Sequence, residues 1–185
     1  WGLFTEIVQS ATTSIIGNAG LVKKVYLPRE IFPLSSVGGA LFNFGIQSVV
    51  LLLGIVVLAS FPIGWSLLLA PAAVITVVVF ATAIGLALSA INVYLRDVQH
   101  FVEIAILVLF WASPIVYSFT FVHNALAGSW VESLYLANPI TICIIAMQRA
   151  LWNGGITGTG DFAQVWPDDI GLRLLIAFVV SVVLL

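Results

Sequence analysis

The stretch from residue 31 to residue 95 contains no Asp, Glu, Lys, Arg or His. Crossing the roughly 30 Å of membrane hydrocarbon takes about 20 consecutive apolar residues, so this stretch is long enough for more than one crossing. Its middle reads FPIGW over residues 61–65, where proline and glycine mark a turn and tryptophan suits a membrane interface. The pattern predicts two membrane-spanning helices, over 34–59 and 66–91, joined by a short hairpin.

The whole chain carries too little charge to cover a water-soluble domain. Only 8% of its 185 residues are Asp, Glu, Lys or Arg, and the mean hydropathy is +1.19. This composition excludes soluble globular, disordered and coiled-coil proteins. The net charge of -2 gives no basic surface for nucleic acid, and the single cysteine, Cys143, excludes an internal disulfide and a CxxC metal site. We therefore expect an all-α integral membrane protein.

Three more segments complete a single transmembrane domain over residues 1–185. We expect a partial span over 1–18, a full span over 98–118 and a truncated span over 170–185. Asp97 and Asp169 are placed to N-cap the last two helices, and Pro114 is placed to kink or end the first of these. Because the chain starts at Trp1 and its last apolar run is too short to cross the hydrocarbon, we expect the sequence to be a fragment.

The basic residues give the orientation of these spans. They cluster before residue 31 and after residue 95, at Lys23, Lys24, Arg29 and Arg96. Two crossings separate these groups, so both lie on one side of the membrane, and the positive-inside rule makes that side the cytoplasm. The sequence therefore predicts two cytoplasmic elbows, at 20–33 and 92–100, and a long outer loop at 119–169.

One helix in the outer loop is predicted to be too short to cross the membrane. Asn138 and Pro139 form a helix start, with a capping side chain followed by proline at the first helical position. The run Asn153-Gly154-Gly155 stops the helix. The 14 residues between these signals span about 21 Å. We therefore predict an outer re-entrant region over 119–152.

Small residues recur at four-residue spacing along the second complete span, at Ala81, Gly85 and Ser89. Such a stripe lets two helices approach closely in lipid. Packing within one subunit is the favoured interpretation, and a dimer face is the alternative.

Aromatic residues gather in the predicted outer half of the chain. Those that we single out as a candidate substrate path are Trp111, Tyr117, Trp130, Tyr135 and Trp152. An aromatic belt at the membrane interface is the ordinary explanation, and stacking on sugar rings is the sharper one. Their spacing does not separate the two.

Several kinds of chemistry are absent from the sequence. Neither Lys23 nor Lys24 follows the glycine that a Walker A loop requires, and no HExxH or GxSxG motif occurs. We therefore predict no catalytic residue, no metal site and no cofactor in this chain. Within the spans Glu103 is the one ionisable candidate, and snorkelling to the interface best explains it. An uphill transporter of this kind would take its energy from another chain.

Four segments appear in an order that is typical of one family. They are KKVYLPREIFP after an Asn-Ala-Gly turn, YLRDVQHF, FWASPIVY and NPITICIIAMQRALW. Together they resemble the membrane subunit of ABC-2 type exporters, in the branch that exports polysaccharides and polyol phosphates. The resemblance covers nearly the whole chain. It implies a six-span permease, of which this chain would hold part of span two and spans three to six.

The resemblance also implies partners and site residues. The permease would act as a homodimer with two copies of a separate ABC ATPase, which would bind ATP and Mg. The ATPase-coupling residues would be Lys23, Lys24, Tyr26, Pro28, Arg29, Glu30, Arg96 and Asp97. The cargo would be a glycan on a polyprenyl-diphosphate lipid, of galactan, O-antigen or teichoic-acid type. The complex would lie among the lipids of the bacterial cytoplasmic membrane.

Two alternatives to a polysaccharide exporter stay open at this point. One is an ABC-2 exporter of drugs or lipids with the same architecture. The other is a membrane glycosyltransferase, which would need acidic residues for metal or base chemistry near the interface. The only acidic cluster available for it is Asp161, Asp168 and Asp169.

Overall fold

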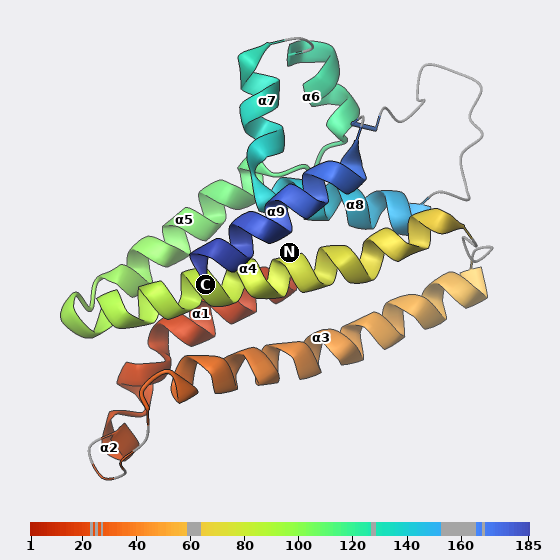
Figure 1. The fold of residues 1–185 in the computed structure, drawn as a ribbon. Helices are drawn as coiled ribbons and strands as arrows, with labels where there is room; N and C mark the ends of the chain where they lie inside the picture. The colour runs from red at the N-terminus through yellow and green to blue at the C-terminus, as the bar shows by residue number, and fades with distance from the viewer. Residues whose placement is uncertain are drawn as a thin grey trace.

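The computed structural model describes residues 1–22, 24, 26, 28–58, 64–126, 129–152, 166–167 and 169–185. These residues form helices and no strand, which confirms the predicted all-α class (Figure 1). The elements are α1 (Gly2–Gly17), α2 (Ala19–Val22), α3 (Ile31–Leu58), the 3-10 turn η1 (Trp65–Leu68), α4 (Leu69–Tyr94), α5 (Val98–Ala112), α6 (Phe119–Leu126), α7 (Trp130–Ala137), α8 (Pro139–Trp152) and α9 (Ile170–Leu184).

The uncharged stretch forms the two longest helices, α3 and α4. Among the described residues these two, over Ile31–Val57 and Trp65–Tyr94, are long and apolar enough to cross a membrane. α3 starts three residues before the predicted 34–59 because Pro33 lies in its first turn, where a helix needs no N–H donor. Residues 60–63 of the predicted hairpin lie outside the described residues, and Trp65 beyond them is 89% exposed.

Helix α1 packs against α4, α3 and α5 and supplies much of the core. Its buried apolar side chains recur at helical spacing, at Leu3, Phe4, Ile7, Val8 and Ala11. Gly85 of α4 faces this surface so closely that a Cβ there would lie 2.7 Å from the Ala11 Cβ. Ala81 and Ser89 are buried on either side of Gly85. The predicted small-residue stripe therefore packs within one subunit.

A buried polar contact ties the end of α4 to α1. The Asn92 side chain is fully buried, and its Nδ2 donates to the Thr12 carbonyl at 2.9 Å. Hydrogen bonds between helices in an apolar environment contribute about 0.6 kcal/mol on average and up to about 1.7 kcal/mol. This bond fixes the start of the 92–100 segment against α1.

Helix α5 is shorter than the span predicted over 98–118. It ends at Ala112, and its 15 residues cover only about 22 Å. Pro114 is the physical reason, because proline cannot continue the hydrogen-bonded ladder. The Pro114 carbonyl, just beyond the helix end, accepts a hydrogen bond from the Gln148 side chain of α8 at 2.9 Å, and this bond ties the break to α8.

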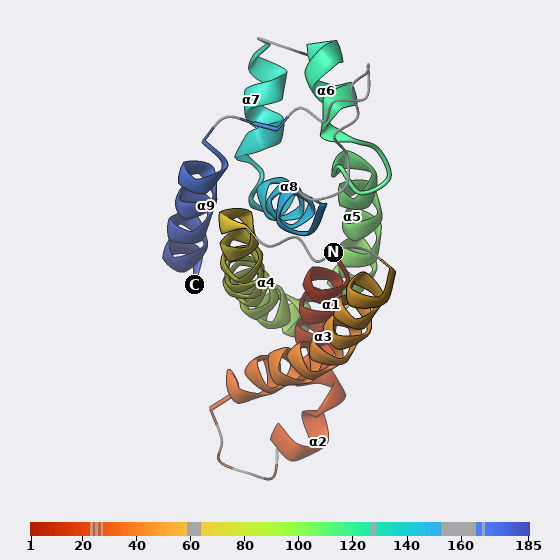
Figure 2. The same ribbon diagram turned by 90° about the vertical axis from the view of Figure 1, so that its right-hand side faces the viewer.

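Within the outer region that the sequence predicted to be re-entrant, α7 and α8 form a bent pair of helices. α7 and α8 meet at an angle of 82°. The Asn138 side chain accepts from the Ile140 N–H at 3.0 Å, so the predicted cap of α8 is present. α8 then runs back beside α4 and α9, while α6 and α7 project from the bundle (Figures 1 and 2). Asp97 and Asp169 occupy N-cap positions, but neither makes a side-chain capping bond.

The close approach of α1 and α4 makes a first prediction. Gly85→Ala should lower the midpoint of thermal unfolding in detergent, because overpacking costs about 1–3 kcal/mol and outweighs the roughly 1 kcal/mol that alanine gains in a helix. Gly45→Ala is the matched control, because a Cβ at Gly45 meets nothing within 4 Å. Ala11→Gly should restore the Gly85→Ala variant. A midpoint that rises equally in both alanine variants would contradict this packing.

Candidate functional site: the coupling end and a polar groove

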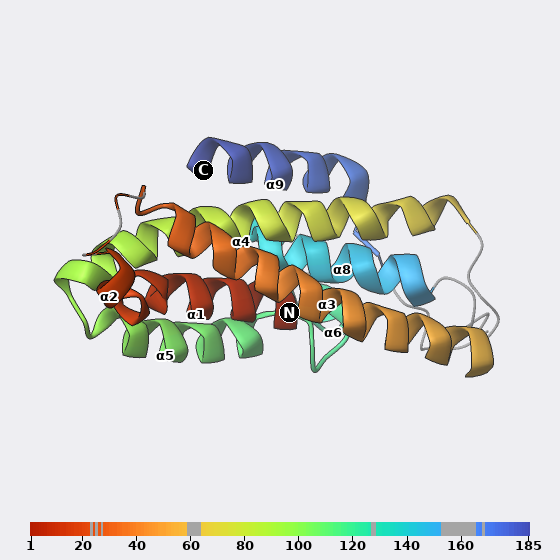
Figure 3. The same cartoon turned by 90° about the horizontal axis from the view of Figure 1, so that it is seen from below.

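The two predicted elbows lie at the same end of the helical bundle. Residues 20–33 connect α1 to α3, and residues 92–100 connect α4 to α5. In Figures 1 and 3 both connections lie at the left, opposite the end at which α3 stops. We call this the coupling end. The sequence argument about even crossings and the tertiary arrangement therefore agree on which segments share a side.

Every described side chain that the sequence nominated for coupling is exposed. These residues are Lys24, Tyr26, Pro28, Arg29, Glu30, Arg96 and Asp97. Lys23 lies outside the described residues. Exposed apolar side chains accompany the charges, with Tyr94 and Leu95 exposed by 87% and 63%. Charged and apolar groups mixed on one end of a membrane protein suit a surface that docks a second protein.

A groove of about 280 Å³ opens between α1 and α5. Seven residues line this polar groove: Gln9, Ser10, Thr12, Thr13, Gln99, Val102 and Glu103. Six of the seven carry hydroxyl, amide or carboxylate groups. The chain as a whole is 62% hydrophobic, so this lining differs from its average composition. The groove lies at the start of α5, close to the coupling end, and it gathers polar side chains beside an otherwise apolar bundle. The groove is therefore the strongest candidate for a substrate path.

The groove offers mainly acceptors and amides. The hydroxyls of Ser10 and Thr13 donate back to the carbonyls of Glu6 and Gln9, so their oxygen lone pairs remain to accept from a ligand. Glu103 lies 3.8 Å from His100, and both side chains are well exposed. Hydroxyl-rich molecules match such a lining, because each hydroxyl both donates and accepts hydrogen bonds.

The outer aromatic residues are only partly brought together. Tyr135 donates to the Tyr117 hydroxyl at 3.3 Å, and Tyr117 donates to the Trp111 carbonyl at 3.2 Å. Trp130 begins α7 and is 76% exposed. Trp152 ends α8, and its side chain lies outside the described residues. The three linked residues join the end of α5 to the α6–α7 hairpin, whereas Trp130 does not belong to this chain of bonds.

A second contact closes the α6–α7 hairpin. His123 Nδ1 lies 2.6 Å from Glu132 Oε1, and the Ser129 side chain accepts from the Glu132 N–H at the start of α7. Phe119 stacks on Tyr135 with ring centroids 6.4 Å apart. These contacts hold the two short helices side by side and give His123 a structural role.

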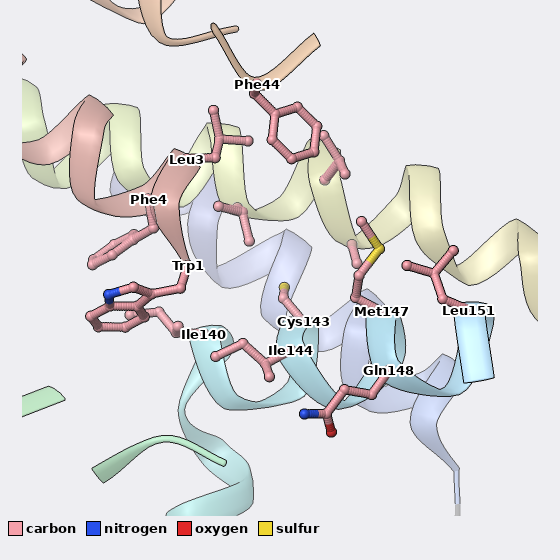
Figure 4. Close-up of a pocket in the computed structure, with 13 residues that line it drawn as sticks. Trp1, Leu3, Phe4, Phe44, Ile140, Cys143, Ile144, Met147, Gln148 and Leu151 are labelled. Atoms are coloured by element: carbon pink, nitrogen blue, oxygen red, sulfur yellow. The ribbon is translucent and has the colours of Figure 1, made fainter. Parts of the chain in front are cut away.

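An apolar pocket of about 270 Å³ lies between α1, α3, α4 and α8 (Figure 4). Carbon-rich side chains dominate its lining, among them Phe4, Phe44, Ile140, Ile144, Met147 and Leu151. Gln148 lies at its edge and bonds to Pro114 instead. Such a lining can accommodate hydrocarbon.

The polar groove was not predicted from the sequence. Its signal was present in α1, where Glu6, Gln9, Ser10 and Thr13 recur at three- and four-residue spacing on one helical face. The second wall could not be found in this way, because Gln99 and Glu103 come from α5, some 90 residues later. Of the acidic cluster considered for a glycosyltransferase, Asp161 and Asp168 lie outside the described residues.

Comparison with known proteins identifies the family of this chain. The family model described as ABC-2 type transporter matches residues 1–152. The chain is 28% identical over 155 residues to the O-antigen export system permease protein RfbA of Klebsiella pneumoniae, an alignment that covers 83% of the chain and 58% of that protein. It is 29% identical over 185 residues to the O-antigen export system permease protein RfbA of Myxococcus xanthus, covering 100% and 65%. The chain thus spans less than two thirds of these relatives.

The hydroxyl chain at the outer hairpin makes a second prediction. Tyr117→Phe removes two hydrogen bonds and Tyr135→Phe removes one, each of which contributes about 1 kcal/mol. We expect the unfolding midpoint in detergent to fall about twice as far for Tyr117→Phe. Tyr94→Phe, at an exposed tyrosine of the coupling end, is the control and should leave the midpoint unchanged. Equal midpoints for all three variants would show that the bonds do not form.

Proposed function

This chain belongs to the ABC-2 type transporter family, and from that premise we propose that it is the membrane-spanning permease of an ATP-driven exporter of lipid-linked polysaccharide. The cargo is a glycan carried on a polyprenyl diphosphate. The observation that carries the proposal is the polar groove between α1 and α5, which is lined by groups that suit sugar hydroxyls. The names of the O-antigen export relatives support the same cargo class.

The energy source in this proposal is a separate ABC ATPase, which binds ATP and Mg. The exposed coupling end supports this partner, because it mixes charges with exposed apolar side chains on both elbows. Arg29 and Glu30 would engage the ATPase from one elbow, and Arg96 and Asp97 from the other. The chain itself is proposed to carry no cofactor and no catalytic residue.

Each elbow is joined directly to one wall of the polar groove. Residues 20–33 follow α1, and residues 92–100 precede α5. When ATP binding closes the ATPase dimer, a displacement of the two elbows would move α1 and α5 relative to each other and open the groove. The Asn92–Thr12 bond keeps α4 attached to α1 during this movement. In this proposal, movement of the ATPase would reach the polar groove through the two elbows and the helices α1 and α5 that they join.

Two copies of the permease in the bacterial cytoplasmic membrane complete the proposal. The groove is open in a single chain, so a second copy would enclose the path away from lipid. The alternative of an exporter for hydrophobic drugs or lipids accounts less well for a groove in which six of seven residues are polar. The apolar pocket suits hydrocarbon and can take part of the lipid carrier.

Charge reversal tests the coupling end. Arg29→Glu and Arg96→Glu in the full-length protein should each abolish glycan export, and the ATPase should no longer co-purify with the permease. Arg173→Glu, on α9 and away from both elbows, is the matched control and should retain the ATPase. Normal export and normal co-purification in both elbow variants would overturn the coupling role.

Cysteine labelling tests the orientation. In a Cys143→Ala background, Lys24→Cys should resist a membrane-impermeant maleimide added to intact cells, whereas Trp65→Cys should react, because both positions are exposed but at opposite ends. Permeabilised cells, in which both variants should react, provide the control. Labelling of Lys24→Cys from outside would place the coupling end on the wrong side for a cytoplasmic ATPase.

A further inference from the structure

A carboxylate lies beside the longest apolar helix. Asn43 Nδ2 of α3 donates to Glu6 Oε1 of α1 at 2.5 Å. Both side chains point away from the apolar core: Asn43 is exposed and Glu6 is half-buried. From the sequence we predicted that Glu103 is the one ionisable group within the spans. The structure corrects this prediction, because Glu6 of α1 lies beside α3.

The position of Asn43 gives the depth of this contact. Asn43 lies near the middle of the candidate membrane span Ile31–Val57, about 18 Å along the helix from Ile31. A lipid-facing carboxylate at that depth is strongly disfavoured, and natural proteins keep such groups for bundle interiors or polar pathways. Glu6 therefore needs a polar neighbour beyond the Asn43 amide.

No cation neutralises this carboxylate among the described residues, in which the ion pairs found are His100–Glu103 and His123–Glu132. A bond to Asn43 that only held α1 to α3 would need no charge, because glutamine at position 6 could make it equally well. The carboxyl group instead suits a ligand that donates hydrogen bonds, because both of its oxygens can accept them. Bonds from neutral donors to a carboxylate are short and strong.

Glu6 continues the polar groove along α1. Residues 6, 9, 10 and 13 share one helical face, opposite the buried face of Leu3 to Ala11. Together with Asn43, Gln99 and Glu103 they form what we call the polar track: Glu6, Gln9, Ser10, Thr13, Asn43, Gln99 and Glu103. The track contains two carboxylates, amides and hydroxyls, and none of its members is Lys or Arg.

We propose that the polar track selects an uncharged glycan, whose ring hydroxyls donate to Glu6 and Glu103, over a phosphate-containing polymer. This inference rests on the proposed export function and narrows it. Among the cargo types considered above, it favours a neutral galactan or O-antigen chain over a teichoic-acid type polyol phosphate. The physical reason is that phosphodiesters offer acceptors and negative charge to a surface that already presents both.

The test compares two probes that share one lipid carrier. The full-length permease and its ATPase are reconstituted in vesicles of phosphatidylethanolamine and phosphatidylglycerol. One probe is a polyprenyl-diphosphate galactose oligomer, and the other is a polyprenyl-diphosphate glycerol-phosphate oligomer. The headgroup is identical, so a difference in transport reports the polymer. We expect the galactose probe to be transported at least about tenfold faster, as expected for the loss of one charge-assisted hydrogen bond.

Variants then assign the preference to the polar track. Glu6→Gln keeps the size of the side chain and a bond to Asn43, and should slow the galactose probe about tenfold while the ATPase still co-purifies. Glu6→Lys should reduce or reverse the preference between the probes. Asp169→Asn, which removes a carboxylate outside the track at an exposed turn, should transport like the unaltered protein. Glu103→Gln changes an exposed residue of the track on α5, and its transport rates test the same preference if a substitution at position 6 prevents folding.

The outcomes separate this inference from the function on which it rests. Transport of neither probe by the unaltered complex would refute the export proposal itself. Equal transport of both probes would overturn the selectivity. Faster transport of the glycerol-phosphate probe would also overturn it. Unchanged rates in both Glu6→Gln and Glu103→Gln would reduce the Glu6–Asn43 contact to a bond that holds two helices together.

Discussion

The need to satisfy every backbone polar group away from water governs this structure. It accounts for an all-helical chain, and it is most visible where a helix breaks. α5 stops before Pro114, and the Pro114 carbonyl just beyond its end accepts from the Gln148 side chain of α8. α8 begins inside the protein, and the Asn138 side chain takes up the Ile140 N–H. α8 can therefore pack against α4 and α9, while α6 and α7 project from the bundle.

Helix α1 carries two functions on its two faces. One face is apolar and small, and it meets α4 at the Ala11–Gly85 approach. The other face carries Gln9, Ser10 and Thr13, which line one wall of the polar groove, and Glu6 lies one turn before them on the same face. Because the first face is packed, the second is fixed in direction. The proposed export of a hydrophilic polymer would use this combination of a rigid attachment and a polar surface.

Local signals in the sequence predicted much of the fold for a simple reason. Asn138-Pro139 and Pro114 act through the backbone of their own segment, so the start of α8 and the break after α5 could be anticipated. The length of α5 was overestimated because apolar residues continue to Tyr117 past the proline. The polar groove escaped notice because its walls, at Gln9 and Gln99, are distant in sequence. Glu6 was passed over because its own segment reads as only mildly polar.

The sequence by itself determined that the chain is a helical membrane protein with two segments long enough to cross the hydrocarbon, and that it contains no Walker A motif. These follow from hydrophobicity, length and the absence of a motif, which are properties of single segments. Only the tertiary structure decided that Asn43 meets Glu6 and that α1 and α5 line a polar groove. Those relations depend on how the helices pack, and packing is set by contacts between residues far apart in the chain.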